Sequence, residues 1–126
     1  MSSLTQLFLL LILFQVKHFI ADGPLQTKAM VDEKGRYGAP LGLLHAALHC
    51  IGTFAVIAYV THYFLWAVFL AAVDFAIHYH VDYLKERTVR YFGWTTNNGP
   101  FWWSIMADQM LHQLTYIGLA AAAVAA

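Results

Sequence analysis

The sequence predicts an all-α fold: a four-helix transmembrane bundle that runs up-down-up-down and leaves both termini on the same side. Hydrophobic residues make up 60% of the 126-residue chain and charged residues only 11%, whereas about 25% of the residues in a soluble domain are charged. The mean hydropathy is +0.57, and a soluble body of this length is too small to hide so much apolar surface. We therefore expect residues 1–126 to form a single integral membrane domain.

The breaks between apolar stretches predict where the four helices begin and end. The first apolar run stops at Gly23 and Pro24, because proline disfavours helix at the residue before it. Residues 38–73 contain no Asp, Glu, Lys or Arg, which is too long for one helix across a ~30 Å hydrocarbon core. We therefore divide them near Thr61, while Pro100 suits the first turn of a last helix. The predicted helices are residues 4–22, 41–60, 63–90 and 100–122.

The distribution of charge predicts the orientation of the helices. All seven Lys and Arg residues lie in or next to the loops that follow the first and third helices. The positive-inside rule places these charged loops in the cytoplasm and both termini outward. Because the formal net charge is zero, no basic patch indicates nucleic acid. The expected partner is the lipid bilayer, and a homo-oligomer is left open.

Each predicted helix carries one pair of His or Asp residues spaced four apart. Residues at this spacing share one face of a helix, and ionisable groups inside a membrane are costly to keep. In helices that alternate in direction, the four pairs fall at one level near the cytoplasmic side. We expect eight side chains to meet there: His18 and Asp22, His45 and His49, His78 and Asp82, and Asp108 and His112.

Imidazoles and carboxylates together suit a divalent transition metal, with zinc favoured and iron or manganese as alternatives. Helix bundles hold two-metal sites with ligands from several helices, and eight ligands suffice for two ions. We expect a metal-dependent hydrolase that acts on an anionic, lipid-like or phosphorylated substrate, with Asp82, Lys85 and Asp108 as catalytic residues. The residues expected around the metals or the substrate are Gln26, Lys28, Asp74, His80, Arg87 and Gln109.

Four other interpretations fit the same pairs. They could form a structural polar network that ties the helices together, or a path for proton, ion or metal transport. A His-rich di-iron membrane oxidase and a non-catalytic membrane interaction protein are the remaining two. Phosphate-binding loops, serine nucleophile elbows, paired cysteines and H-E-x-x-H are all absent from the sequence.

Four ordered motifs carry a resemblance to a known family. They are H-F-x-x-D-x-x-L-Q from His18 to Gln26, the single His45, H-x-x-x-D-x-x-K from His78 to Lys85, and D-Q-x-x-H from Asp108 to His112. In these motifs the chain resembles an uncharacterised domain-of-unknown-function family of small His/Asp-rich polytopic membrane proteins of bacteria and phages. The resemblance implies a bacterial inner-membrane location and no particular activity. It implies that the shared polar set is His18, Asp22, Gln26, His45, His78, Asp82, Lys85, Asp108, Gln109 and His112. His49 and Asp74 lie outside these motifs.

Overall fold

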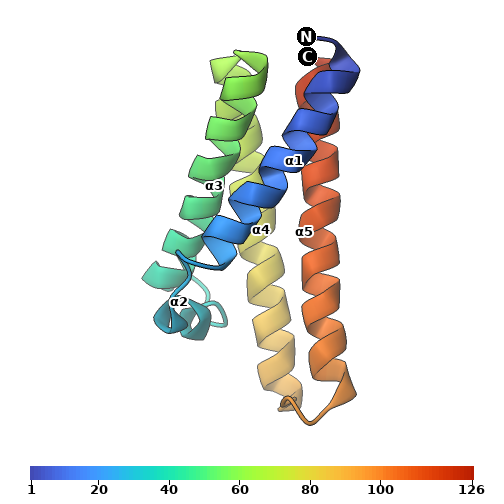
Figure 1. Ribbon diagram of the computed structural model, residues 1–126. Helices are drawn as coiled ribbons and strands as arrows, with labels where there is room; N and C mark the ends of the chain where they lie inside the picture. Colours follow the sequence, from blue (N-terminus) through green and yellow to red (C-terminus); the bar gives the residue numbers. More distant parts are fainter.

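The computed structural model describes all 126 residues as five helices without a strand. Four long helices alternate in direction, and one short helix lies in the first loop (Figure 1). In chain order the helices are α1 (Ser3–Asp22), α2 (Lys28–Glu33), α3 (Pro40–Thr61), α4 (Phe64–Phe92) and α5 (Gly99–Ala125). The all-α prediction is confirmed, whereas α2 was not predicted.

The molecule has two distinct ends along its long axis. The terminal end holds both chain termini and the turn between α3 and α4, while the loop end holds residues 23–39 and 93–98 (Figure 1). The turn between α3 and α4 is made at His62, which adopts a left-handed backbone with φ of 60°. Its backbone N–H donates to the carbonyl of Ala58, so the turn ends α3 as a left-handed cap.

Three helices, α1, α3 and α4, are long and apolar enough to cross a membrane. Large hydrophobic side chains on their outer faces are exposed, among them Phe8, Ile51 and Phe69. Continuous exposed apolar surface of this kind marks contact with lipid or with a partner. The fifth helix, with 27 residues, is of similar length but is not among these three.

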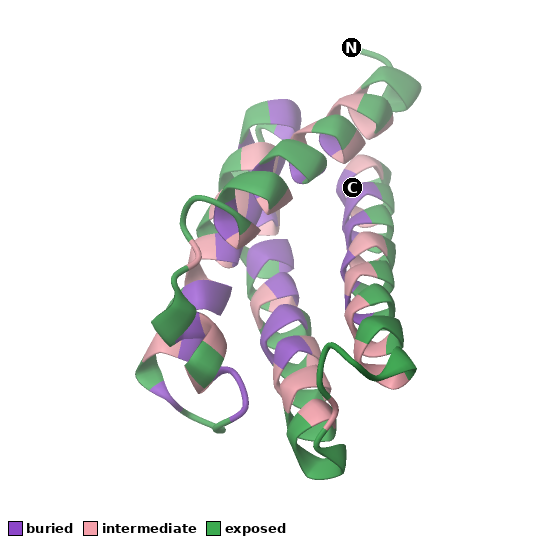
Figure 2. Ribbon diagram, turned by 60° about the horizontal axis from the view of Figure 1, so that its bottom comes forward, coloured by how far each residue is buried: buried purple, intermediate pink, exposed green.

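Buried residues occur on every helix (Figure 2), and they divide into an apolar core and a polar layer. The apolar core fills the terminal end, and its members are Leu10, Phe14, Ile57, Ala58, Val60, Ala67, Leu70, Tyr116, Leu119, Ala120 and Ala123. The polar layer lies toward the loop end, and its buried members are Lys17, Lys34, His45, His49, Thr53, Asp74, His78, Asp82, Asp108 and His112. Charged groups are almost never buried unless they are paired, so this layer calls for an explanation beyond packing.

The segment around α2 closes the loop end over this polar layer. The side chain of Thr27 accepts the backbone N–H of Met30 at 3.2 Å, which starts α2. The carboxylate of Glu33 accepts the backbone N–H of Leu41 at 2.6 Å and so caps the first turn of α3. The backbone N–H of Gly38 donates to the hydroxyl of Tyr79 at 2.7 Å. The loop is therefore tied to both α3 and α4.

We expect Glu33→Ala to lower the free energy of unfolding by about 1 kcal/mol, the usual cost of losing a helix cap. Thermal unfolding of the purified protein in detergent measures this effect. Asp32→Ala is the matched control, because the side chain of Asp32 forms only an exposed ion pair with Lys28, and such pairs contribute little. Equal melting temperatures for the two variants would contradict the capping role of Glu33.

Candidate metal centre

Four buried imidazoles from three helices meet in the polar layer. The rings of His49 and His78 stack with centroids 3.8 Å apart, and those of His78 and His112 stack at 4.1 Å. The ring of His45 lies edge-on to that of His49 at 4.8 Å. None of the four is more than 2% exposed. The pairs on α3, α4 and α5 thus converge on one place, as their spacing predicts.

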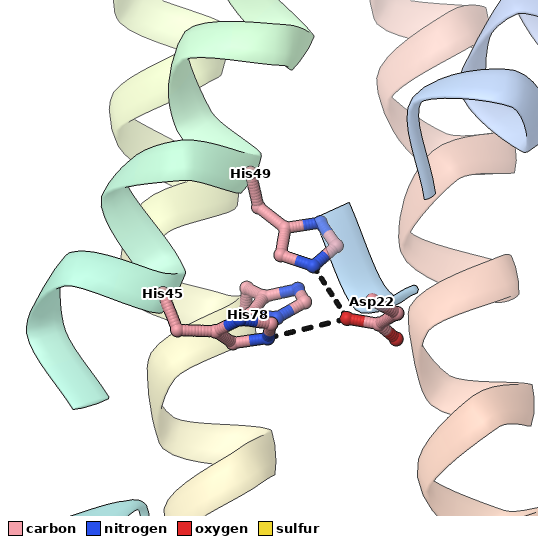
Figure 3. A group of neighbouring side chains, drawn as sticks. All are labelled: Asp22, His45, His49 and His78. Atoms are coloured by element: carbon pink, nitrogen blue, oxygen red, sulfur yellow. Dashed lines mark hydrogen bonds and ion pairs between the residues drawn. The ribbon is translucent and has the colours of Figure 1, made fainter. Parts of the chain in front are cut away.

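A carboxylate at the end of α1 approaches this cluster from one side. The Oδ1 atom of Asp22 lies 2.7 Å from Nε2 of His49 and 3.2 Å from Nε2 of His45 (Figure 3). The Gly23 that follows Asp22 ends α1, and its backbone N–H donates to the carbonyl of Phe19. The break after Asp22 therefore leaves this carboxylate at the tip of the helix, facing α3.

A second carboxylate, on α4, approaches the cluster from the side of α5. The Oδ2 atom of Asp82 lies 3.2 Å from Nε2 of His78 and 3.5 Å from Nε2 of His45. Its other oxygen, Oδ1, lies 3.1 Å from Nε2 of His112, which is also 3.3 Å from Oδ1 of Asp108. The carboxylate of Asp82 thus connects the imidazoles of three helices.

Two groups of side chains within this cluster could hold a metal ion. One consists of Asp22, His45, His49 and His78, and the other of His78, Asp82 and His112; within each group the ligand atoms lie within 4.8 Å of one another.

The hydrogen bonding of the cluster supports metal binding. Both ring nitrogens of His45, both ring nitrogens of His78 and Oδ1 of Asp108 are buried without a hydrogen-bond partner. Leaving a buried polar group unsatisfied costs about 1–3 kcal/mol, and a bound cation would satisfy one nitrogen of each of these two rings. Imidazole and carboxylate ligands without thiolates suit zinc, manganese or iron. The residues present therefore fit a divalent transition metal.

His18, also a predicted ligand, belongs to neither group. Its Nδ1 atom lies 2.9 Å from the hydroxyl of Tyr116. Its Nε2 atom lies 2.8 Å from Oε1 of Gln109 and 3.0 Å from Oδ2 of Asp22. Because hydrogen bonds engage both ring nitrogens, His18 acts beside the cluster and supports Asp22. Gln109 also donates to Asp108 at 3.1 Å, so the predicted neighbour role of Gln109 has a definite geometry.

A buried lysine of α1 contacts the cluster from the side of the terminal end, although the sequence predicted it among the cations in or next to the loops. The ammonium of Lys17, a residue only 7% exposed, donates to the hydroxyl of Tyr116 at 2.9 Å and to Nδ1 of His49 at 3.1 Å. It also lies 3.7 Å from Oδ2 of Asp74, which accepts the hydroxyl of Thr53. Asp74 therefore neutralises Lys17 beneath the cluster and is in neither ligand group.

A second buried lysine, which was not predicted as a site residue, enters the site from the loop that follows α2. The ammonium of Lys34, a residue only 7% exposed, lies 3.4 Å from Oδ2 of Asp82 and donates to Oε1 of Gln26 at 2.6 Å. Gln26 donates in turn to the backbone carbonyl of Asp22. This lysine, with Gln26, closes the site toward the loop end.

Three residues predicted around the site lie away from it. The side chain of Lys28 is 89% exposed and pairs with Asp32 on the surface. The ring of His80 is turned outward, where Nε2 lies 2.9 Å from the hydroxyl of Tyr37. Arg87 is exposed as well. The faces of α2 and α4 that carry these residues point away from the helix interface, so the three side chains do not contact the cluster, and a role for them beside a substrate stays a prediction.

Lys85 lies near the site but is already paired. Its ammonium lies 2.7 Å from Oε1 of Glu86. Together with Asp108 it lines a groove of about 220 Å³ between α4 and α5. The ammonium of Lys34, in contrast, contacts a carboxylate of the cluster itself, so Lys34 is the lysine that joins the cluster from the loop end.

A family model described as "Protein of unknown function (DUF3307)" matches residues 9–125. No match was found among curated proteins or among solved structures. The matched residues include every side chain of the polar layer.

Proposed function

The chain belongs to the DUF3307 family, whose function is unknown, and we propose that it is a membrane-embedded, metal-dependent hydrolase of an anionic, lipid-like or phosphorylated substrate. Membership agrees with the family resemblance of the four motifs. One observation carries the proposal: His/Asp groups that could hold a metal are buried among helices apolar enough to cross a membrane.

We place all four long helices across the bilayer as a four-helix bundle, with α5 as the fourth span. The 27 residues of α5 extend about 40 Å at 1.5 Å per residue, which exceeds a ~30 Å hydrocarbon core. The loop end, which carries Lys28, Lys34 and Arg36, then faces the cytoplasm and the termini face outward. In this orientation the centre lies on the cytoplasmic side, within reach of a lipid headgroup.

The chemistry follows from the groups that surround the centre. A divalent ion bound there, with zinc proposed first, would supply Lewis-acid activation of a phosphoryl or carbonyl oxygen and of water. Asp108 has a buried carboxylate oxygen without a hydrogen-bond donor and is suited to accept a proton from the attacking water. Lys34 would orient the anionic group of the substrate, since its ammonium is the buried cation that reaches the ligand carboxylates from the loop end.

Transport is the rival function that one observation favours. The polar layer extends further toward the terminal end than the four His/Asp pairs alone, because it also includes Lys17, Asp74 and Thr53. Beyond them, however, the ring of Phe14 stacks on that of Tyr116 with centroids 5.2 Å apart, and the apolar core follows. A polar path through the molecule is therefore interrupted. We expect no ion flux in proteoliposomes.

The experiment combines metal analysis with turnover. We expect the purified protein to contain a stoichiometric transition metal, to hydrolyse phosphorylated lipids or p-nitrophenyl phosphate, and to lose both metal and activity to a chelator. Chelation should also lower the melting temperature, because an ion present at 100 times its Kd stabilises the folded state by about 2.7 kcal/mol. A protein purified without bound transition metal, and unable to take one up, would overturn the proposal.

A lysine variant separates substrate binding from metal binding. We expect Lys34→Met to retain the metal and to raise KM, with partial rescue by Lys34→Arg, because the ammonium acts on the substrate anion. Lys28→Met is the matched control on the exposed side of the same loop. Loss of the metal from Lys34→Met would show that Lys34 supports the ligands instead.

A further inference from the structure

We infer that the centre binds a single divalent metal ion and that only part of the His/Asp cluster ligates it. This inference rests on the proposed metal-dependent function and replaces the two ions expected from the sequence. The ligands are two imidazoles and two carboxylates: His45, His78, Asp22 and Asp82. The outer imidazoles of the stack, His49 and His112, hold the two carboxylates in place by hydrogen bonds and do not ligate the ion.

The two ligand imidazoles are those whose nitrogens have no hydrogen-bond partner. Nε2 of His45 lies 3.2 Å from Oδ1 of Asp22 and 3.5 Å from Oδ2 of Asp82, and Nε2 of His78 lies 3.2 Å from the same Oδ2. These atoms are close but do not form hydrogen bonds. Adjacent ligands of a tetrahedral ion with bonds of about 2.0 Å lie about 3.3 Å apart. Each of these three atom pairs therefore has the spacing of neighbouring ligands on one cation, with Asp82 linked to the group of Asp22, His45 and His78 through His45 and His78.

The tautomer of His49 excludes it from this ligand set. Lys17 donates to Nδ1 of His49 at 3.1 Å, and an ammonium offers donors only. Nδ1 is therefore the unprotonated nitrogen, and the ring proton lies on Nε2. That proton is donated to Oδ1 of Asp22 at 2.7 Å (Figure 3). A nitrogen that carries a proton has no lone pair for a metal.

Lys17 is itself fixed in this position from two directions. It donates to the hydroxyl of Tyr116 at 2.9 Å and lies 3.7 Å from the carboxylate of Asp74. The tautomer of His49 is thus set by buried partners on α1, α4 and α5, at the ring nitrogen that does not face Asp22.

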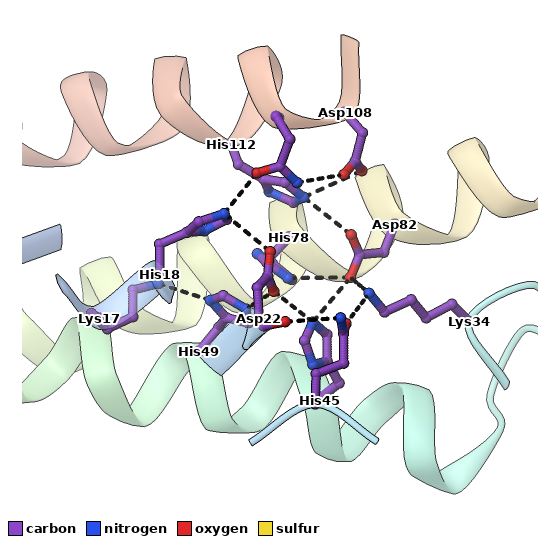
Figure 4. A network of polar contacts seen from close by, with 12 residues as sticks. Lys17, His18, Asp22, Lys34, His45, His49, His78, Asp82, Asp108 and His112 are labelled. Atoms are coloured by element: carbon purple, nitrogen blue, oxygen red, sulfur yellow. Dashed lines mark hydrogen bonds and ion pairs between the residues drawn. The ribbon is translucent and has the colours of Figure 1, made fainter. Parts of the chain in front are cut away.

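The two ligand carboxylates have further contacts: Asp82 with the imidazole of His112, and Asp22 with that of His18. Nε2 of His112 lies within hydrogen-bond distance of Oδ1 of Asp82, and the same nitrogen lies 3.3 Å from Asp108 (Figure 4). Two carboxylate oxygens around one nitrogen indicate an N–H donor. Nε2 of His18 likewise lies 3.0 Å from Oδ2 of Asp22. Each ligand carboxylate is therefore held by an imidazole, as outer partners commonly orient metal ligands.

Titration of the full-length protein with Zn²⁺ against a chromophoric chelator tests this assignment. We expect one ion per chain in the wild type and no binding by His45→Ala. The matched variants His49→Ala and His112→Ala should still bind one ion, with an affinity about 10–100-fold lower, which is typical for loss of an outer partner. Size-exclusion chromatography and far-UV circular dichroism establish that each variant is folded.

X-ray absorption of the Zn²⁺-loaded wild type gives a second measurement that needs no variant. We expect two imidazole ligands per ion, and the same number in His49→Ala. Two ions per chain, three or more imidazoles on one ion, or complete loss of binding by His49→Ala would overturn the single-ion assignment and leave the proposed hydrolase intact. Failure of the wild type to bind Zn²⁺, Mn²⁺ or Fe²⁺ would overturn both.

Discussion

The His78→Leu protein is expected to bind no stoichiometric metal and yet, in metal-free buffer, to melt at a temperature no lower than the wild type. His78 belongs to both groups that could hold a metal, so its loss should abolish binding. Both of its ring nitrogens are buried without a partner, at a cost of about 1–3 kcal/mol for each unsatisfied group. Leucine fills a similar volume and removes that cost.

Adding metal should make the wild type more stable than His78→Leu. An ion at 100 times its Kd raises the unfolding free energy of the wild type by about 2.7 kcal/mol, and the leucine variant cannot gain this. His80→Leu is the matched control two residues further along α4, because its ring is exposed and turned toward Tyr37. We expect it to bind metal as the wild type does.

The same experiment distinguishes a metal centre from a structural polar network. If His78 served only to tie helices together, His78→Leu would destabilise the protein equally with and without metal. Elemental analysis and differential scanning calorimetry of the wild type and His78→Leu, each with and without metal, decide between the two interpretations. A lower melting temperature in metal-free buffer, with no metal in the wild type, would favour the network.

The helix pattern and the level of the site were predictable because they depend on local sequence. Gly23, Pro100 and the uncharged stretch 38–73 mark helix ends that the structure reproduces closely. The spacing of four residues puts each His or Asp pair on one helix face, and alternating helix direction brings the faces together. Neither step requires knowledge of which side chain meets which across a helix interface.

The sequence pattern could not predict which imidazoles are free to ligate a metal and which are engaged in hydrogen bonds. His18 and His49 both occur in pairs with the same spacing, yet a hydroxyl or an ammonium on another helix determines the role of each. Lys34 is brought in by a loop without periodic pattern, so no local signal indicates its burial. Its contact with Asp82 joins residues far apart in sequence.

The burial of Lys17, unlike that of Lys34, was indicated by the sequence. It follows Leu10 and Phe14 and precedes Ala21 at helical spacing, and these four are the buried residues of α1. The predicted orientation counted Lys17 among the seven Lys and Arg residues in or next to the loops. The other six lie at the loop end or in the last turns of α4. The orientation is therefore unaffected and stays a prediction.

We expect Lys17→Met to lower the free energy of unfolding by about 3–5 kcal/mol, because breaking a buried ion pair strands the remaining charge. Asp74 is only 1% exposed and would keep a single donor, the hydroxyl of Thr53. Asp74→Leu should be comparably harmful, since it strands the ammonium. The double variant Lys17→Met/Asp74→Leu should recover most of the loss, because no isolated charge remains.

Metal affinity should not recover together with stability in that double variant. Without the ammonium, Nδ1 of His49 loses its donor, and the hydrogen bond from His49 to Asp22 is no longer enforced. We therefore expect Zn²⁺ binding to stay about 10–100-fold weaker than in the wild type, although unfolding in detergent shows near-normal stability. The exposed pair Lys28 and Asp32 provides the matched double variant, which should change neither quantity. If both stability and Zn²⁺ affinity recover, Lys17 contributes to stability alone. If stability recovers but Zn²⁺ affinity does not, Lys17 has two separate roles: it pairs with Asp74 and it positions His49.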